Sequence, residues 1–288
     1  MKNILGVLFI LFASFGLSAQ YQLGPESQKQ NGVPEGKVAK YIWHSPSYDN
    51  YREYYVYVPA QYDASIPAAL MVFQDGHSYV NEQGGWRVPI VFDNLIHKKD
   101  MPVTIGLFIN PGHDSENLPV NRFRSSNRAN EYDEMDDRYV SMLISELIPE
   151  LRKTLNISED RKMHAICGLS SGGICAWTAA WERPEVFHKV LSHYGSFTNI
   201  RGGDRYPGII RKSAKKDIKI FMQDGSTDLD NIYGNWYLSN LQMESALKFK
   251  GYELKTEWGS GGHTSDHGSS ILPKSLRWLW SDVMGCVF

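Results

Sequence analysis

The sequence is poor in cysteine and carries no surplus of charge of either sign. Its only cysteines are Cys167, Cys175 and Cys286, and so small and odd a number does not form a disulfide framework. Their spacing matches no metal motif. Buried thiols are the simplest interpretation, although a local bridge between Cys167 and Cys175 stays open. Lys and Arg number 30 against 32 Asp and Glu, so no basic surplus indicates a nucleic-acid partner.

Long hydrophobic runs are also missing after the first twenty residues. A short basic start at residues 1–3 precedes an apolar stretch over 4–17, which ends at the small residues Ser18 and Ala19. This pattern predicts a signal peptide over residues 1–19, cleaved after Ala19. The alternative is a membrane anchor, which would need about 20 apolar residues. No cysteine follows the cleavage site, so we expect a secreted or periplasmic protein without lipid attachment or membrane contact.

The remaining composition is ordinary for a globular protein. Of the 288 residues, 42% are hydrophobic and 22% are charged, which excludes disorder, collagen and coiled coil as the main architecture. The length fits one large α/β domain, expected over residues 36–288 after a flexible polar leader at 20–35. Tyr and Trp are plentiful, at 16 and 8, and such residues line pockets for rings and sugars as well as building cores.

Segments of strand and helix character alternate along this domain. The expected strands cover residues 37–43, 52–58, 68–73, 103–109, 163–167, 189–194, 218–222 and 253–258. The expected helices cover residues 88–97, 131–155, 171–181, 236–249 and 272–283, with a long surface loop at 111–130. The first two strands alternate apolar and polar residues, which favours antiparallel strands at a sheet edge. The whole pattern predicts a mostly parallel central sheet with helices on both faces.

A G-x-S-x-G motif stands where an expected strand runs into an expected helix. Its residues are Gly168-Leu169-Ser170-Ser171-Gly172. A sharp strand-to-helix turn forces the central serine into strained backbone angles, and glycines two residues before and after it remove the clashes. Only Ser170 has glycine at both places, so we predict Ser170 as a nucleophile. The alternative is a glycine-rich turn that merely packs a helix on a sheet.

A serine nucleophile needs a base, and nine histidines compete for this role. His263 follows the glycine-rich segment Gly259 to Gly262, just after the last expected strand, where a flexible loop can deliver an imidazole to the sheet edge. His267 lies four residues later. Together with Asp266 these histidines could also be metal ligands, but this spacing is weak support for a metal site. We therefore predict His263 as the base and expect no metal and no other cofactor.

The histidine in turn needs a carboxylate that fixes its tautomer. The loop after the second-last expected strand holds three aspartates, Asp224, Asp228 and Asp230. We predict Asp228 as the acid and keep Asp230 as the alternative. The chain order Ser170, Asp228, His263 is that of α/β-hydrolases and differs from the orders in chymotrypsin and subtilisin.

A tetrahedral intermediate also needs N–H donors for its oxyanion. The backbone N–H of Ser171, directly after the nucleophile, is one expected donor. The other is expected from the loop after the strand at 68–73, which reads Gln74-Asp75-Gly76-His77. Gly76 permits close backbone approach, so the N–H of Gly76 or of His77 is the second candidate. The alternative for this loop is an ordinary glycine turn.

Six blocks of the sequence, taken in order, resemble one protein family. The blocks are Phe73-Gln74-Asp75-Gly76, Phe108-Ile109-Asn110-Pro111-Gly112, Arg128-Ala129-Asn130-Glu131-Tyr132-Asp133, Gly168-Leu169-Ser170-Ser171-Gly172-Gly173, Gln223-Asp224-Gly225 with Asp228, and Gly261-Gly262-His263. Over residues 36–283 the chain is similar to the esterase D and enterochelin-esterase-like group, which includes the feruloyl and acetyl-xylan esterases of carbohydrate esterase family one.

The resemblance implies an α/β-hydrolase fold without a large lid. It implies a triad of Ser170, Asp228 and His263 that cleaves carboxylic esters through an acyl-enzyme. It also implies that Arg128 and Glu131 form a structural pair below the site.

One departure from the family bears on the substrate. Enterochelin esterases usually carry an extra N-terminal domain, whereas here only about thirty residues precede the first expected strand. We therefore expect an exported esterase that removes feruloyl or acetyl groups from plant polysaccharide. Four aromatic residues are expected to bind the substrate, with core packing as the alternative for each: Tyr79, Trp86, Tyr233 and Trp236.

Three other functions stay open at this point. One is a siderophore or general small-ester esterase with the same mechanism. Another is an acyltransferase, in which a sugar replaces water. The third is a non-catalytic carbohydrate-binding protein on a hydrolase scaffold. The oligomeric state is left open.

Overall fold

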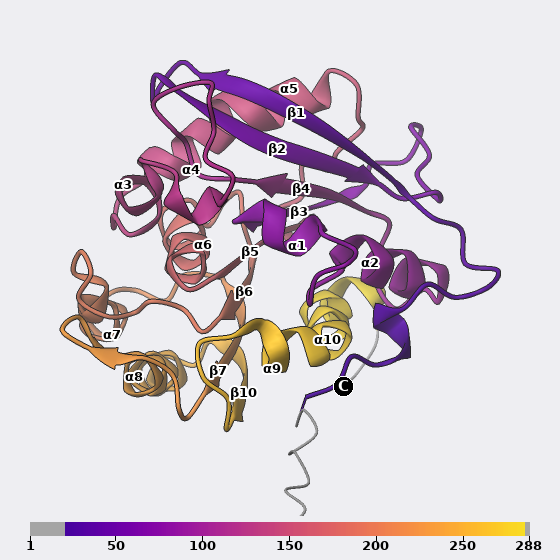
Figure 1. Cartoon of the computed structure of the whole chain (residues 1–288). Coiled ribbons are helices and arrows are strands. Elements are labelled where there is room, and N and C mark those ends of the chain that lie inside the picture. The colour runs from indigo at the N-terminus through magenta and orange to yellow at the C-terminus, as the bar shows by residue number, and fades with distance from the viewer. Residues whose placement is uncertain (1–20, 286–288) are drawn as a thin grey trace, which may run out of the picture.

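The computed structural model describes residues 21–285, so the predicted signal peptide and Cys286 lie outside the described residues. An eight-stranded sheet has the strand order β1-β2-β4-β3-β5-β6-β7-β10 (Figure 1). The strands are β1 (Lys37–Ser45), β2 (Asn50–Val58), β3 (Ala69–Gln74), β4 (Thr104–Ile109), β5 (His164–Leu169), β6 (Lys189–His193), β7 (Lys219–Gly225) and β10 (Glu253–Gly259). A hairpin of β8 (Asp230–Asn231) and β9 (Gly234–Asn235) lies in the loop after β7.

The pairing directions confirm the expected topology. β2 runs antiparallel to both β1 and β4, and the strands from β4 across to β10 are parallel to their neighbours. The carboxyl ends of these parallel strands therefore meet at one edge of the sheet, where α/β proteins bind their ligands. A mostly parallel sheet with antiparallel N-terminal strands and helices on both faces is the α/β-hydrolase fold.

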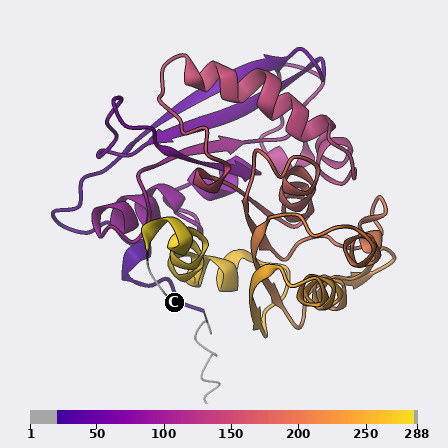
Figure 2. The same cartoon turned by 180° about the vertical axis from the view of Figure 1, so that it is seen from behind.

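Alternate residues along the central strands enter two separate cores. In β3, Leu70 and Val72 face one core, whereas Met71 and Phe73 face the other. This period of two is the geometry of a strand. The helices α6 (Ser171–Glu182), α7 (Tyr206–Lys212) and α8 (Trp236–Phe249) cover the first face. On the second face lie α1 (Gly76–Val80), α2 (Val88–His97), α9 (Ser265–Ser270) and α10 (Leu272–Met284), as the opposite views in Figure 1 and Figure 2 show.

The single helix expected over residues 131–155 is divided in the structure. It comprises α3 (Arg128–Tyr132), then α4 (Arg138–Met142), a π turn at Leu143–Leu147 and α5 (Ile148–Arg152). The π turn comes just before Pro149, which has no N–H to donate and whose ring pushes against the preceding turn. The apolar repeat predicted a helix correctly from about residue 138 onward, but the continuous helix from 131 was wrong.

The segment expected to be a flexible leader is held against the second face. Its turn η1 (Pro25–Ser27) packs beside α2, where the Asn94 side chain donates to the carbonyl oxygen of Glu26 at 2.9 Å. The Glu26 carboxylate also forms a 2.9 Å ion pair with Arg277 of α10. The expectation of a loose leader was wrong, because these contacts come from distant helices and leave no trace in the polar composition.

Three short helices, α1, α7 and α9, were not expected from the sequence. Each is too short to show an apolar repeat. Within residues 21–285, none of the helices has the length and apolar character needed to cross a membrane.

Candidate active site

Ser170 stands on a tight turn between β5 and α6. Its φ of 54° and ψ of −122° lie in a region that non-glycine residues rarely occupy. A Cβ added at Gly168 would lie 2.1 Å from the carbonyl oxygen of Gly172. Position 168 therefore accepts no side chain, and the strained turn that the motif predicts is present with Ser170 at its apex.

Two loops from neighbouring strands cross beside this turn. The N–H of Thr227, after β7, donates to the carbonyl oxygen of Gly261, after β10, at 3.2 Å. A Cβ added at Gly225 would lie 1.9 Å from the same oxygen. The crossing therefore requires glycine at position 225, and it brings the loop that carries Asp228 against the loop that carries His263.

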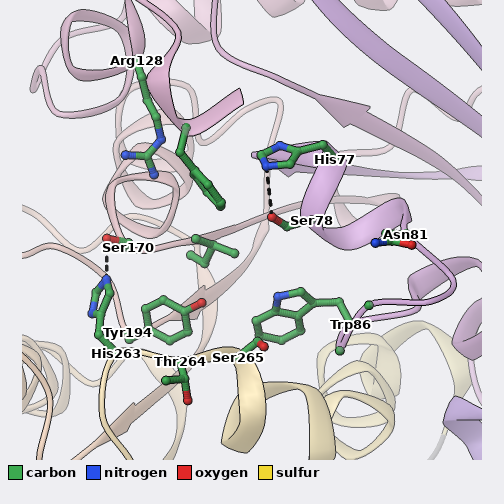
Figure 3. Close-up of a pocket in the computed structure, with 14 residues that line it drawn as sticks. His77, Ser78, Asn81, Trp86, Arg128, Ser170, Tyr194, His263, Thr264 and Ser265 are labelled. Atoms are coloured by element: carbon green, nitrogen blue, oxygen red, sulfur yellow. Dashed lines mark hydrogen bonds between the residues drawn. The ribbon is translucent and has the colours of Figure 1, made fainter. Parts of the chain in front are cut away.

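His263 lies between the other two residues of the predicted triad. Its Nε2 is 2.9 Å from Ser170 Oγ, the contact dashed in Figure 3. Its Nδ1 is 2.7 Å from Asp228 Oδ1. Because a carboxylate only accepts, the ring proton resides on Nδ1, and the Ser170 hydroxyl donates to Nε2. The rings of Tyr194 and Trp236 meet the imidazole edge-on, with centroids 4.7 and 6.0 Å away.

Asp228 reaches His263, whereas the alternative acid, Asp230, does not. The Asp228 side chain is fully buried, and its Oδ1 also accepts the N–H of Leu229 at 2.5 Å. Burial by itself raises the pKa of Asp228, but hydrogen bonds with His263 and Asp224 outweigh it and hold the pKa below its ordinary value. Asp230 is exposed in strand β8 of the hairpin, so the reserve assignment was wrong.

Ser196 contacts the nucleophile and was missed from the sequence. Its Oγ lies 3.2 Å from Ser170 Oγ and accepts the indole N–H of Trp236 at 3.0 Å. Because an indole N–H can only donate, the Ser196 hydroxyl is free to donate to Ser170, which donates to His263. The hydrogen bonds thus run in one direction toward the imidazole. Only the position of Ser196 shortly after the carboxyl end of β6 could have indicated this contact.

The expected oxyanion donors differ in whether their N–H groups already have a hydrogen-bond partner. The N–H of Ser171 belongs to the first turn of α6, where N–H groups have no partner within the helix. The N–H of His77 donates to Asn110 Oδ1 at 3.0 Å, so it is already paired. Gly76, whose added Cβ would lie 2.3 Å from the backbone of Phe108, is the second donor that we retain.

A cavity of about 610 Å³ opens beside the Ser170 hydroxyl. Arg128 and Tyr194 line it close to Ser170, and Trp86 and Asn81 line it farther along (Figure 3). The lining residues come from the segment after β3, the long loop after β4, the turn after β5, the segment after β6 and the loop after β10. The cavity is therefore lined by Ser170 and His263, whereas Asp228 lies outside its lining.

Only one of the four aromatic residues expected to bind substrate lines this cavity, and it is Trp86. Tyr79 is fully buried, and its hydroxyl hydrogen-bonds His193 Nδ1 at 2.9 Å. Trp236 is buried as well, and Tyr233 lies exposed in the β8–β9 hairpin outside the cavity lining. Tyr79 and Trp236 are therefore core residues, which a sequence does not distinguish from aromatic residues that bind a ligand, whereas Tyr233 is a surface residue of the hairpin.

Arg128 enters the cavity instead of pairing with Glu131. Its Nε and Nη2 donate to the two carboxylate oxygens of Asp75 at 2.9 and 2.7 Å, and its guanidinium lies 5.3 Å from the ring centre of Phe123. Glu131 pairs with the fully buried Arg52 at 2.9 Å. The expected Arg128–Glu131 pair was wrong, because each side chain meets a buried partner from a different strand.

Within residues 21–285, the cysteines and histidines form neither a bridge nor a shared metal site. Cys167 and Cys175 are buried free thiols. His267 Nδ1 lies 3.1 Å from the side-chain amide nitrogen of Gln223, on the far side of β7 from Asp228. Across the described range 21–285, no group of three or more His, Cys, Asp or Glu side chains could hold a metal ion.

Comparison with known proteins relates these features to one family. The model of the Esterase family matches residues 45–283. The chain is also similar to the iron(III) enterobactin esterase of Dickeya dadantii (strain 3937), with 24% identity over 256 residues, which are 82% of this chain and 53% of the relative. The chain thus spans about half the length of that relative.

Two solved structures have the same fold. The enterobactin esterase of Shigella flexneri, solved in the presence of 2,3-di-hydroxy-N-benzoyl-serine, matches with a TM-score of 0.70 and 21% identity over 88% of this chain and 61% of that one. The CE1 ferulic acid esterase of Anaeromyces mucronatus, in complex with ferulic acid, matches with a TM-score of 0.69 and 15% identity over 91% of this chain and 99% of that one. Since the family model spans nearly all of the described residues, the chain belongs to the Esterase family.

Proposed function

We propose that the protein is a serine carboxylic ester hydrolase. The observation that carries this proposal is the hydrogen-bonded series of Ser170, His263 and Asp228, with distances of 2.9 and 2.7 Å, at a cavity. A serine hydroxyl is a weak nucleophile unless a base removes its proton, and this arrangement supplies both a base and the acid that orients it. Membership of the Esterase family supports the same reaction.

In the proposed reaction, His263 takes the proton of Ser170 as Oγ attacks the ester carbonyl. The N–H groups of Ser171 and Gly76 stabilise the oxyanion of the tetrahedral intermediate. His263 then gives its proton to the leaving alcohol, and the acyl group stays on Ser170. A water molecule, deprotonated by His263, attacks the acyl-enzyme and releases the acid.

The cavity favours an aromatic acyl group over an acetyl group. Its volume, about 610 Å³, lies within the roughly 300–1,000 Å³ of small-molecule sites. The rings of Trp86, Phe123 and Tyr194 suit contact with an aromatic ring. Ser78 and Asn81 offer hydrogen bonds to polar ring substituents. We propose a hydroxylated benzoyl or cinnamoyl ester, for which feruloyl groups on plant polysaccharide are the first candidate and siderophore esters the second.

The names of two structural neighbours support this substrate class. One was solved with a dihydroxybenzoyl compound and the other with ferulic acid, and both ligands are aromatic acids or their derivatives. Export from the cytoplasm is part of the proposal, because residues 1–19 have the pattern of a signal peptide. Finding the protein outside the cytoplasm, beginning at Gln20, would support it, and an uncleaved cytoplasmic protein would contradict it.

The reaction is tested with methyl ferulate, p-nitrophenyl acetate and a dihydroxybenzoyl-serine ester. We expect the aromatic esters to have the higher kcat/KM, and we expect Ser170→Ala to lower kcat by about four orders of magnitude or more. Asp228→Asn should lower kcat by about 10³- to 10⁴-fold, because it gives His263 the wrong tautomer. Asp230→Asn is the matched control, and its kcat should equal that of the wild type.

Other outcomes lead to the alternative functions. Full activity of Ser170→Ala would contradict the proposal. Preferential transfer of the acyl group to an added sugar would identify an acyltransferase. Binding of feruloylated sugar without turnover would identify a binding protein on a hydrolase scaffold.

A further inference from the structure

A second aspartate lies directly behind the proposed acid. Asp224 is near the end of β7, four residues before Asp228, and its side chain faces α8. It is fully buried. Its Oδ1 accepts the N–H of Gly225 at 2.6 Å, and its Oδ2 accepts a side-chain N–H of Asn240, in α8, at 2.9 Å. The carboxyl group is thus tied to two elements of the fold.

A tight turn, in which the N–H of Asp228 donates to the carbonyl oxygen of Gly225 at 3.1 Å, brings Asp224 and Asp228 together, and the two carboxyl groups interact. Asp228 Oδ1 is used by His263 and by the N–H of Leu229. Asp228 Oδ2 is buried, and no N–H or O–H group that the structure describes over residues 21–285 donates to it. Such an orphan oxygen on a buried charge is costly. Two carboxylates cannot relieve this cost, because each can only accept.

We propose that Asp224 is a neutral carboxylic acid in the resting enzyme and donates its proton to Asp228 Oδ2. Asp224 is then a positioning residue, which holds the carboxylate that orients His263. This inference rests on the proposed esterase function and adds a fourth residue to its hydrogen-bonded series. The series begins at Asp224, which Asn240 of α8 holds in place, and ends at Ser170.

The proton belongs to Asp224 because the surroundings of the two carboxyl groups differ. Burial, together with the hydrogen bond and the negative charge of Asp228, raises the pKa of Asp224 well above its ordinary value. On the other side, the hydrogen bond from His263 helps to keep the pKa of Asp228 low despite its burial. Adjacent carboxyl groups that repel each other when both are ionised share one proton in this way.

The other groups that face this pair carry no charge near neutral pH. α8 presents Asn240 and Trp236. The segment after β6 presents Tyr194, whose pKa burial raises well above the usual range. α9 presents His267, which hydrogen-bonds the backbone of Asp224 and whose pKa burial lowers. The charge at the site is therefore set by Asp224, Asp228 and His263.

Three substitutions separate a positioning role from simple packing. Asp224→Asn keeps the shape and places an amide N–H where the acid O–H stands. Asp224→Leu keeps the approximate volume but offers no donor. Asp230→Asn changes an exposed aspartate of the following hairpin and serves as the matched control.

We expect Asp224→Asn to keep kcat within about threefold of the wild type. Asp224→Leu should lower kcat about 10- to 100-fold, because the Asp228 carboxylate loses a charge-assisted hydrogen bond. KM should change little in either variant, since Asp224 does not line the cavity. Equal losses in Asp224→Asn and Asp224→Leu would contradict the donor role.

The pH dependence of kcat/KM tests the charge on Asp224. The informative part is the acidic limb, where kcat/KM falls as the pH is lowered. Exchanging a neutral acid for a neutral amide leaves the field at His263 unchanged, so the limb of Asp224→Asn should superimpose on that of the wild type. An ionised Asp224 would behave differently. Its replacement would remove a negative charge and move the limb to lower pH by about one unit or more, and this result would overturn the proposal.

An infrared measurement tests protonation without relying on activity. At pH 8 the wild type should show the carbonyl band of a buried carboxylic acid, and the band should vanish in Asp224→Asn and persist in Asp230→Asn. At this pH Asp133, whose pKa burial raises to about 6, is ionised. Absence of the band from the wild type overturns the proposal even if the variants fold poorly. If Ser170→Ala disproved the esterase reaction, the band would still decide the state of Asp224.

Discussion

Ser170 stands half-buried at the apex of its turn, at the cost of an unfavourable backbone conformation. Its φ of 54° costs about 1–3 kcal/mol, as strained non-glycine residues do. Its hydroxyl lies between Ser196 Oγ and His263 Nε2, at 3.2 and 2.9 Å. The indole N–H of Trp236 determines the direction of these hydrogen bonds. At the scale of single residues, the site therefore depends on a buried tryptophan that does not touch the cavity.

Ser196→Ala tests this dependence. We expect kcat to fall about fivefold, because one hydrogen bond to the Ser170 hydroxyl contributes roughly 1 kcal/mol. We also expect the free energy of unfolding to fall by about 1–3 kcal/mol, since the Trp236 N–H loses its buried acceptor. Steady-state kinetics and urea unfolding measure the two effects.

Ser192→Ala is the control for Ser196→Ala. The Ser192 hydroxyl is also buried, but within residues 21–285 it has no hydrogen-bond partner. Its removal should leave kcat unchanged. Wild-type kcat in Ser196→Ala would show that Ser196 does not orient Ser170.

The crossing of the loops after β7 and β10 is the decisive feature at the scale of elements. Parallel pairing of these strands places both loops at the same edge of the sheet. Gly225 then lets the two backbones touch, so that Asp228 and His263 meet although they lie 35 positions apart in the sequence. Gly225, at the end of β7, thus controls the distance between Asp228 and His263.

Gly225→Ala should separate the two loops. The new Cβ would lie 1.9 Å from the Gly261 carbonyl oxygen, and backbone at that distance has to move. We expect stability to fall by about 1–3 kcal/mol. We expect kcat to fall about 100-fold as His263 loses its alignment with Asp228. Thermal unfolding and kinetics check both effects.

Gly208→Ala is the control for Gly225→Ala, and its effect on the stability of the protein should have the opposite sign. Gly208 is exposed in α7, and an added Cβ would meet no atom within 4 Å. Alanine should therefore stabilise the protein by about 0.5 kcal/mol and leave kcat unchanged. If Gly225→Ala behaved like Gly208→Ala, the crossing would not require glycine.

At the scale of the whole molecule, a cluster of buried charged groups lies at the opposite end of the sheet from the candidate active site. Lys189 begins β6 and Lys219 begins β7, and both side chains are fully buried. Their Nζ atoms lie 2.7 and 3.3 Å from the carboxylate of Asp282 in α10. Because the strands are parallel, this cluster lies at their amino ends, whereas Ser170 lies at a carboxyl end. We therefore expect the cluster to affect stability and not the reaction.

Asp282→Asn should lower the free energy of unfolding by roughly 3 kcal/mol at pH 7, because two buried ammonium groups lose their shared carboxylate. Burial alone raises the pKa of Asp282, but Lys189 and Lys219 hold it below the ordinary value of 3.8. The carboxylate therefore stabilises the fold above about pH 4, and this contribution is lost as the pH falls through the lower folded-state pKa.

Urea unfolding at several pH values measures this difference. The wild type and Asp282→Asn should converge in stability in strong acid, while kcat at pH 7 stays equal. A difference that did not depend on pH would mean that the charge of Asp282 is not its cause.

Local patterns in the sequence were sufficient to predict the architecture and the three residues, Ser170, His263 and Asp228, that the structure brings together. The helices over Val88–His97 and Trp236–Phe249 have the bounds that the sequence predicted. The glycines around Ser170 predicted its turn, and the glycine-rich loop before His263 predicted a histidine at the sheet edge. These features are local, because strand and helix periodicity and turn sterics act over a few neighbouring residues.

Tertiary packing alone decided which side chains meet. Trp236 and Tyr79 became core residues, Arg128 paired with Asp75, and Asp224 came to lie behind Asp228. Each of these contacts joins segments that no local periodicity relates, and burial determines whether a polar group must find a partner. The sequence by itself therefore determined the sheet and the turn that carries Ser170, and it indicated which histidine and aspartate lie near that turn. Only the folded molecule decided the walls of the cavity and the hydrogen bonds that orient the triad, because those depend on distances across the core.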